Sequence, residues 1–590
     1  MARTKKSFNP RDFTKKKDED ILVVIQEDFK RAETYQRPFF DKFADFYKQY
    51  SCIHDGLRPD GSNLFIPYIY NIIETALPKL LSSIFESHPF ITYKPVGMDD
   101  AHKGEAMTNL VYFQMKQKMK ATTRLYEVFK SAIMYGTAFS KQTWKYEEKE
   151  VIERQMVDEE VEMEDGNLVT VPIRKPTPTK KVTYDAPVIR NIPLEALYFD
   201  PGYQDLDDSP FVIHEYFMEL HELKAGQREG YYKNVDKVSD SPQDGPLKER
   251  YDSVGTVMGN MKDGVKIWEY WTDYWLVTVA NGDTVIRVEP NPYYHKKKPF
   301  VKWVALAMPN EPYGKSMIET LVDLQSELNT LRNQRIDNVS LALNRMFLIA
   351  KGSGIDVDQL KSRPNGWIEV DDVSKDIKEL EVKDITSAAY RDEEIVKTDM
   401  DVTSGVHNMD RGQPTDRRET ATVASLMSSA SSERFKLQVL MLCEDPMTEL
   451  GWQLAELNKQ FLEDETFILI TGDDGKTGRA RVEFGEINTD FDVIPTSSAT
   501  DAAVNKEVRR GQLIQMMNVA LNNPVVNQAG FLKEIFKEFE FKNLDELIQE
   551  TPPPPPPGDD GGVPTDDAGG LYPQQGGVGA MAQYLQNPNL

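Results

Sequence analysis

Residues 311–345 read EPYGKSMIETLVDLQSELNTLRNQRIDNVSLALNR, and this stretch decides the fold. Ser316 and Glu319 have the spacing of a capping box, which marks the start of a helix. Apolar residues follow at steps of four and three along one stripe, namely Leu321, Leu324, Leu328 and Leu331. We expect a single helix of about thirty residues, roughly 45 Å long at 1.5 Å per residue.

The other faces of this helix are rich in amides and guanidinium groups. They carry Gln325, Asn329, Arg332, Asn333, Gln334, Arg335 and Asn338. The apolar stripe is narrow and the other faces of the helix are polar. This pattern favours packing against neighbouring helices over burial in a core. We therefore expect the leucine stripe to be buried between subunits of an assembly.

A small insertion and a second helix follow. Residues 346–385 combine apolar strands near 347–350, 367–370 and 377–382, a helical piece near 357–361 and a turn at 363–366. The pattern of residues 386–403 is helical, and Gly405 stands where a helix usually ends. The two helices thus bracket an inserted α/β unit.

The chain beyond the second helix returns towards its N-terminal half. After a polar loop, a very long helix runs to about Phe461 with a kink expected at Pro446. Strands near 467–471 and 480–484 are predicted to rejoin a β-rich unit.

That β-rich unit covers residues 139–305, where apolar residues recur with a period of two. Residues 280–283 read ANGD and predict a hairpin turn, because Asn and Gly accept a positive φ. Residues 147–165 hold ten acids against Lys149 and Arg154, which predicts a solvated hairpin or loop. Before this unit, helical spacing is seen in residues 20–46, 72–85 and 108–139, with a kink expected at Pro38.

Both ends of the chain differ from the middle. Residues 1–17 carry seven basic side chains and one acid, which predicts a mobile basic arm. Residues 551–590 are proline or glycine at 17 of 40 positions, which predicts a disordered or extended tail.

The formal net charge of −25 argues against a surface that grips a polyanion by counterion release. Cys52 and Cys443 are too few for a disulfide framework or a cysteine-based zinc site, so synthesis in a reducing cytosol is expected. The N-terminus has no apolar signal region, and no apolar run approaches the ~18 residues of a membrane span. A soluble protein that is not exported is expected.

Catalytic motifs fail on inspection. Gly475-Lys476-Thr477 and Gly314-Lys315-Ser316 imitate a phosphate-binding loop, but Ile470 and Pro309 occupy the places of the first glycine. No HExxH, Cys-His cluster or GxSxG elbow occurs, although a two-metal nuclease built from distant acids stays open. Residues 293–298, YYHKKK, form the best basic-aromatic patch and suit either a nucleic-acid contact or a solvated loop. We expect no catalytic residue, cofactor or metal.

The order of these elements resembles the portal proteins of tailed bacteriophages, in particular the podovirus-type branch. Local motifs resemble them as well: Tyr313-Gly314-Lys315-Ser316 with Leu324-Gln325 and Leu328-Asn329, Asp401-Val402-Thr403-Ser404-Gly405 before Arg418-Glu419-Thr420-Ala421-Thr422, and Asn191-Ile192-Pro193 to Phe199-Asp200-Pro201. None of these motifs is catalytic, so the likeness depends on their order.

The resemblance implies an α+β multidomain portal fold with a wing, a helical stem, a small α/β clip and a helical crown. The implied parts are a flexible arm at 1–19, wing at 20–311 and 418–500, stem helices at 312–345 and 386–403, clip at 346–385, tunnel loop at 404–417, crown at 501–550 and tail at 551–590.

The implied function is a dodecameric ring at one capsid vertex of the virion, through which double-stranded DNA is packaged and ejected. The ring would dock the terminase large subunit and then neck or tail adaptor proteins, and would contact the major capsid protein and possible scaffolding protein. The alternatives are a terminase-type packaging ATPase and nuclease, which would need an intact phosphate loop, and a neck or tail protein without a channel.

Three groups of site residues follow from this resemblance. DNA-facing tunnel-loop residues are His407, Asn408, Met409, Asp410 and Arg411; clip docking residues are Arg363, Asn365, Trp367 and Glu369; stem contacts between subunits are Leu321, Leu324, Leu328 and Leu331. Trp367 suits an exposed docking anchor or a buried structural residue, and both readings stay open.

Overall fold

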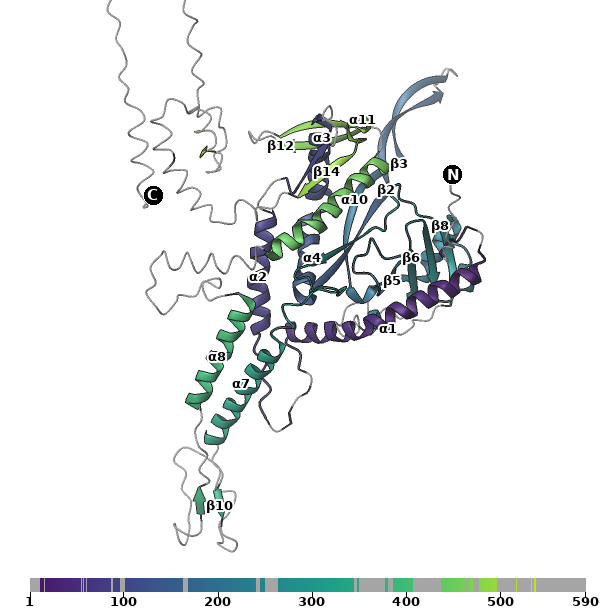
Figure 1. Cartoon of the computed structure of the whole chain (residues 1–590). Coiled ribbons are helices and arrows are strands. Elements are labelled where there is room, and N and C mark those ends of the chain that lie inside the picture. Colours follow the sequence, from purple (N-terminus) through teal and green to yellow (C-terminus); the bar gives the residue numbers. More distant parts are fainter. Residues whose placement is uncertain are drawn as a thin grey trace, which may run out of the picture. The chain divides into compact units, whose positions relative to one another are not determined.

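The computed structural model divides into two compact units, residues 1–512 and 513–590, which are described separately (Figure 1). It describes most of residues 11–495, and its gaps of five or more residues are 96–100, 163–167, 240–244, 250–263, 350–376, 380–385, 407–436 and 472–476. Beyond residue 495 it describes only Met516, Leu532, Ile535 and Phe536. The crown and tail predictions therefore lie almost wholly outside the described residues.

The N-terminal part of the first unit is helical, as predicted. Its helices are α1 (Asp18–Tyr50), α2 (Tyr68–Phe85), α3 (Ala101–Phe113), the π-helical turn Gln114–Lys118 and α4 (Ala121–Tyr135). The apolar stripe of α1 is buried, and Pro38 lies inside the helix without ending it. The expected single stretch 108–139 is wrong, because it divides into two helices and the start of a strand.

The expected mobile arm is also shorter than predicted. Arg11 donates hydrogen bonds of 2.8 and 3.0 Å to the carboxylate of Asp28 and one of 3.0 Å to the Tyr270 hydroxyl. Phe13 is buried against Tyr270 and Trp275. Residues 1–10 lie outside the described part, but from Arg11 onward the arm is attached to the body, because a charge-assisted pair and an aromatic anchor hold it.

Two antiparallel sheets form the predicted β-rich unit. A five-stranded sheet has the order β4 (Leu197–Phe199), β5 (Val212–Glu219), β6 (Gly264–Trp271), β7 (Trp275–Ala280) and β8 (Thr284–Pro290). The ANGD turn is confirmed between β7 and β8, with φ of +52° at Asn281 and +73° at Gly282. The helix α5 (Leu220–Arg228) follows β5.

The second sheet has the order β3 (Leu168–Ile192), β2 (Thr137–Glu162) and β9 (Phe300–Val304). Strands β2 and β3 pair from Phe139 with Ile192 out to Glu162 with Leu168, so the acidic stretch lies in a long hairpin, as predicted. Strand β9 pairs only with the base of β2.

The return strands do not rejoin these sheets. Strands β12 (Glu465–Thr471) and β13 (Thr477–Glu483) pair with each other as a separate sheet. A further sheet pairs β1 (Ile91–Pro95) with β14 (Phe491–Pro495), and α10 (Asp445–Phe461) and α11 (Phe484–Ile487) complete this region. A kink was predicted at Pro446; the structure instead breaks the helix at Glu444, and α10 begins at Asp445 with Pro446 in its first turn.

Tyr313 joins the helical and β parts of the core. Its ring contacts Phe39, Phe43, Phe139 and Phe199 at centroid distances of 4.9 to 6.4 Å. Its hydroxyl accepts a 2.6 Å hydrogen bond from Nε2 of Gln36, and burial raises its pKa. The chain therefore leaves this core for residues 314–343 from a fixed aromatic anchor.

Directly after this anchor, two glycines bring separate backbones together. Gly136 ends α4 with φ of +82°, and a Cβ placed on it would overlap the backbone of Gly314 and Lys315. The Gly314 amide donates a 2.8 Å hydrogen bond to Oγ1 of Thr137. Glycine is required at 136 by both the positive φ and the lack of space.

We predict that Gly136→Ala lowers the free energy of unfolding by about 2–4 kcal/mol, because it adds a clash to the cost of a positive φ. Gly230→Ala is the matched control: Gly230 has φ of +84° but no neighbour within 4 Å of its Cβ position. It should cost only about 1 kcal/mol. Urea unfolding of both variants measures the difference, and equal losses would contradict the role of the close contact.

Candidate functional site

The helices α7 (Val322–Leu343) and α8 (Thr386–Ser404) lie side by side, and the insertion between them contains the strand pair β10 (Phe347–Ile349) and β11 (Ile377–Glu379) (Figure 1). Two helices bracketing a small insertion were predicted, and the described strands agree with the two predicted at its ends. Gly405 follows α8 with φ of +75°, as expected for the residue that ends a helix.

The first of these helices begins later than predicted. Oγ of Ser316 accepts hydrogen bonds from the amides of Ile318 at 3.0 Å and Glu319 at 3.4 Å, but regular helix starts at Val322. Residues 315–317 are instead attached to the core: the amides of Lys315 and Met317 donate to Leu306 O (2.8 Å) and Ile133 O (3.2 Å). These bonds fix the point from which α7 departs.

The leucine stripe is covered by the chain itself. Leu321 and Leu328 are fully buried in the main hydrophobic core, and Leu324 and Leu331 are partly buried against it. The expectation that Leu321 and Leu328 make contacts between subunits is therefore wrong. An apolar stripe predicts burial, but it does not say which surface will cover it.

The polar face of α7 is also partly buried, contrary to prediction. The segment 62–67, which we call the strap, runs along α7 and is hydrogen-bonded to amide and carboxylate side chains spaced four residues apart. Asp337 Oδ1 accepts from Ser62 N (2.7 Å), Asn333 Oδ1 from Leu64 N (2.8 Å) and Asn329 Oδ1 from Ile66 N (2.9 Å).

Return bonds complete this ladder. Nδ2 of Asn333 donates to Leu64 O (3.0 Å), and Nε2 of Gln325 donates to Ile66 O (2.8 Å). Hydrogen bonding by Ser62 also lowers the pKa of Asp337. Alternate strap residues match every fourth helix residue because two extended residues span about 6.6 Å and four helical residues about 6 Å.

The second helix is attached to the first through one buried carboxylate. Glu393 pairs with Arg332 at 3.0 Å, Arg335 at 2.8 Å and Lys397 at 2.8 Å. The Arg335 guanidinium also lies 3.8 Å from the ring centroid of Tyr390. Three of the four cations on α7 and α8 thus surround one acid.

This arrangement leaves an acidic exposed surface on the helix pair. Its exposed acids are Asp323, Glu327, Asp392, Glu394 and Asp399. Arg391 is the exposed cation within these two helices. A nucleic acid would find little on this surface that attracts its phosphates.

The YYHKKK patch is used internally. Lys297 pairs with Asp207 at 2.8 Å and Glu449 at 3.1 Å, and the buried Lys298 pairs with Asp273 at 2.7 Å. Burial and the nearby Lys297 lower the pKa of His295 to about 4, so its ring is neutral at pH 7. The sequence suggested a nucleic-acid contact or a solvated loop. Lys297 and Lys298 instead form ion pairs with acids of the same chain.

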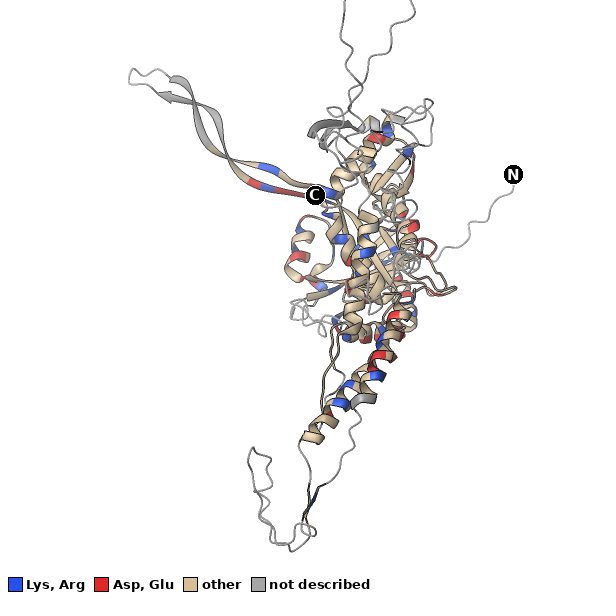
Figure 2. Cartoon of the chain, turned by 90° about the vertical axis from the view of Figure 1, so that its left-hand side faces the viewer, with Lys and Arg blue, Asp and Glu red and all other residues tan. Residues whose placement is uncertain are grey.

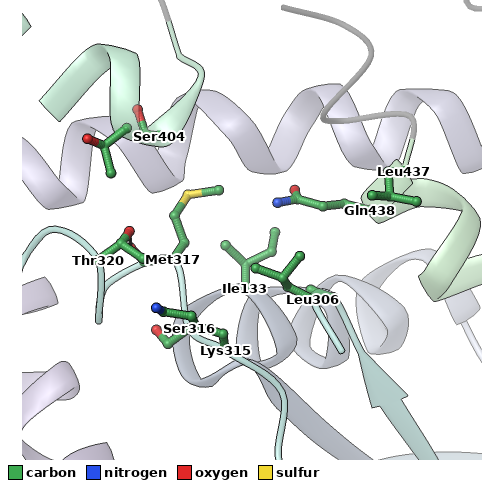
Figure 3. Close-up of a pocket in the computed structure, with 11 residues that line it drawn as sticks. Ile133, Leu306, Lys315, Ser316, Met317, Thr320, Ser404, Leu437 and Gln438 are labelled. Carbon is green, nitrogen blue, oxygen red and sulfur yellow. Dashed lines mark hydrogen bonds between the residues drawn. The ribbon is translucent and has the colours of Figure 1, made fainter. Parts of the chain in front are cut away.

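A pocket of about 320 Å³ lies between the segment that leads into α7, the end of α8 and residues 437–438 (Figure 3). Apolar side chains of Ile133, Leu306, Met317 and Leu437 line it, with Ser404 and Gln438 at its margin. Within the described residues, no group of His, Cys, Asp and Glu has the arrangement of a metal site. The pocket offers packing surface and no catalytic constellation.

The remaining predicted site residues lie outside the described part of the chain. They are the tunnel-loop residues His407, Asn408, Met409, Asp410 and Arg411, and the clip residues Arg363, Asn365, Trp367 and Glu369.

Comparison with known families identifies this architecture. Residues 21–562 match a family model described as phage SU10 portal protein. The chain belongs to this portal family. The resemblance drawn from the order of the elements is confirmed, and the podovirus-type branch is compatible with it. Portal proteins are structural components of the virion and not enzymes, so the prediction of a non-enzymatic protein is confirmed.

For this portal chain, the described helices include none that is long and apolar enough to span a bilayer. Sequence reasoning missed the strap ladder, although a signal was present. Gln325, Asn329, Asn333 and Asp337 recur at steps of four on one face. Such a polar stripe predicts that the helix binds the backbone of another segment.

We predict that Asn333→Ala exposes the Leu64 amide to exchange, because two backbone groups of the strap lose their partners. Hydrogen exchange at Leu64 should accelerate about tenfold or more, as expected for a loss of at least 1.4 kcal/mol. Gln334→Ala is the control, since this neighbouring residue also has an amide side chain but is exposed. Equal exchange in both variants would contradict the ladder.

Proposed function

We propose that this portal protein forms a dodecameric ring at one capsid vertex, through which double-stranded DNA is packaged and later ejected. The observation that carries the proposal is the helix pair α7 and α8, which keeps three cations on the buried Glu393 and exposes acids. In a ring, these helices would form the stem and line the channel.

An acidic stem suits passage of DNA. Basic channel walls would release counterions and hold the duplex, whereas acidic walls give no such attraction. The surface of α7 and α8 also changes along its length. Val339, Leu341 and Leu343 are exposed near the insertion, as are Tyr390 and Ile395 on α8. Exposed apolar residues in such a group favour contact with another subunit.

The stem contacts between subunits are therefore reassigned. Leu321 and Leu328 belong to the core of one chain, and Leu324 and Leu331, which keep some exposure, stay candidates together with the exposed apolar residues near the insertion. Residues 20–311 and 418–500 would form the wing, 346–385 the clip and 501–550 the crown.

The clip would dock the terminase large subunit during packaging and the neck or tail adaptor afterwards. Arg363, Asn365, Trp367 and Glu369 are the docking candidates. The wing and crown would face the major capsid protein and any scaffolding protein. The clip's position between two helices that leave the wing region supports this division, because it separates the insertion from the core.

We predict that Asp323→Lys with Glu327→Lys makes assembled rings retain duplex DNA at low salt, because reversed charges would attract phosphates in the channel. The control, Glu222→Lys with Glu229→Lys, makes the same change at exposed wing positions on and beside α5. Retention should rise at least about tenfold for the first pair only and fall steeply with salt. Equal retention by both would refute an acidic channel lined by α7.

Deletion of His407–Arg411 tests the proposed tunnel loop. These polar residues follow directly after Gly405 and Val406, which end the second stem helix. The deletion should leave ring formation intact and reduce the yield of DNA-filled particles. Normal yields of filled, infectious particles would refute the proposed contact of this loop with DNA.

A further inference from the structure

The β2–β3 hairpin continues far beyond the sheet that contains its base. Strand β9 pairs with β2 only as far as Lys141, which lies opposite Phe300. At the base of the ribbon, Trp144 stacks on Phe461 at a centroid distance of 5.6 Å and donates a 2.7 Å hydrogen bond to Asp185. Beyond this point the two strands leave the body as a ribbon, residues 146–162 paired with 168–185 (Figure 2).

The described side chains of this ribbon are largely uncovered. Exposed apolar residues include Tyr146, Val151, Ile152 and Val182. A two-stranded ribbon by itself is marginally stable in water. Within the described residues, no third strand pairs with it beyond Lys141. Its length and its exposed apolar residues point to a partner that covers it.

The two strands carry opposite charge. In the ribbon, residues 147–162 of β2 hold eight acids and two bases, whereas residues 168–185 of β3 hold four bases and one acid. Between the strands, Lys180 lies 3.7 Å from Glu148, and 71% of the Lys180 side chain is exposed. One long edge of the ribbon is therefore acidic and the other basic.

A ribbon with one acidic and one basic edge is complementary in charge to a second ribbon that lies beside it in the same orientation. The acidic β2 edge of one copy would meet the basic β3 edge of the next, and the pattern repeats without limit or closes into a ring. A two-fold pair would instead place like charges together. The charge pattern thus favours head-to-tail contact.

Proline decides the kind of contact. Pro172, Pro176 and Pro178 lie in β3, opposite Asp158, Arg154 and Ile152. Proline has no N–H to donate, so strand addition along the β3 edge is disfavoured. The contact must therefore be made by side chains, with ion pairs between the long Glu and Lys residues.

We propose that the β2–β3 ribbon is an interface between neighbouring subunits, in which the acidic β2 edge of one copy pairs with the basic β3 edge of the next. This interface rests on the proposed ring and specifies one of its contacts. It adds a charged, salt-sensitive contact at the wing to the contacts of the stem.

Two complementary variants test it. The first, Glu148→Lys with Glu150→Lys, changes the formal charge of residues 147–162 from −6 to −2; the second, Lys180→Glu with Lys181→Glu, changes that of residues 168–185 from +3 to −1. Each alone should form at least about tenfold fewer rings than wild type at low salt, because the first variant loses most of the attraction between the edges and the second replaces it with repulsion. An equal mixture should recover ring formation, because the two variants can alternate around the ring.

Mixing the two variants does not change the charge pairs inside any one hairpin. Recovery of ring formation in the mixture must therefore come from contacts between different subunits. Light scattering and electron microscopy count the rings, with Glu222→Lys and Glu229→Lys as a control of equal charge change. The proposed interface would be overturned if either double variant formed rings as well as wild type, or if the mixture formed no more rings than each variant alone. Either result would leave the ribbon free to bind a capsid protein instead. Absence of rings from wild type would instead refute the proposed ring itself.

Discussion

The structure around the helix pair depends on one constraint: the backbone groups of the strap must be hydrogen-bonded where they lie against α7. Asn333 meets this need with both ends of its amide, Gln325 with its amide nitrogen, and Asn329 and Asp337 with one acceptor each. An unpaired buried backbone group would cost about 1–3 kcal/mol. The ladder therefore sets the register of α7 against the segment that leads into α2, and hence the direction in which α7 leaves the core.

A second buried polar group extends this order to α8. Glu393 holds Arg332, Arg335 and Lys397, so the pairing of the two helices and the charge of their exposed surface have a common cause. Removing a buried acid that three cations share would leave those cations without compensation. The same contacts that stabilise the helix pair thus hold three of its four basic groups on a buried acid.

The N-terminal arm and the hairpin show that a cluster of charged residues in the sequence can be either paired inside the protein or exposed on its surface. Arg11 is held by Asp28, and Lys297 and Lys298 are paired inside the wing region. The acids of β2, in contrast, lie on a ribbon whose described side chains are exposed. Composition alone cannot separate these cases, because the partner of Arg11 is 17 residues away and that of Lys297 is 152 residues away.

By itself, the sequence determined the order of helices and strands, the ANGD hairpin, the end of α8 at Gly405 and membership of the portal family, because these depend on local spacing and turn chemistry. Only the tertiary structure decided that Leu321 and Leu328 are core residues, that Gln325 and Asn333 bind the strap, and that β12 and β13 stand apart. The physical reason is that periodicity reveals which face of a helix or strand is buried, whereas its covering partner is chosen by contacts between segments hundreds of residues apart.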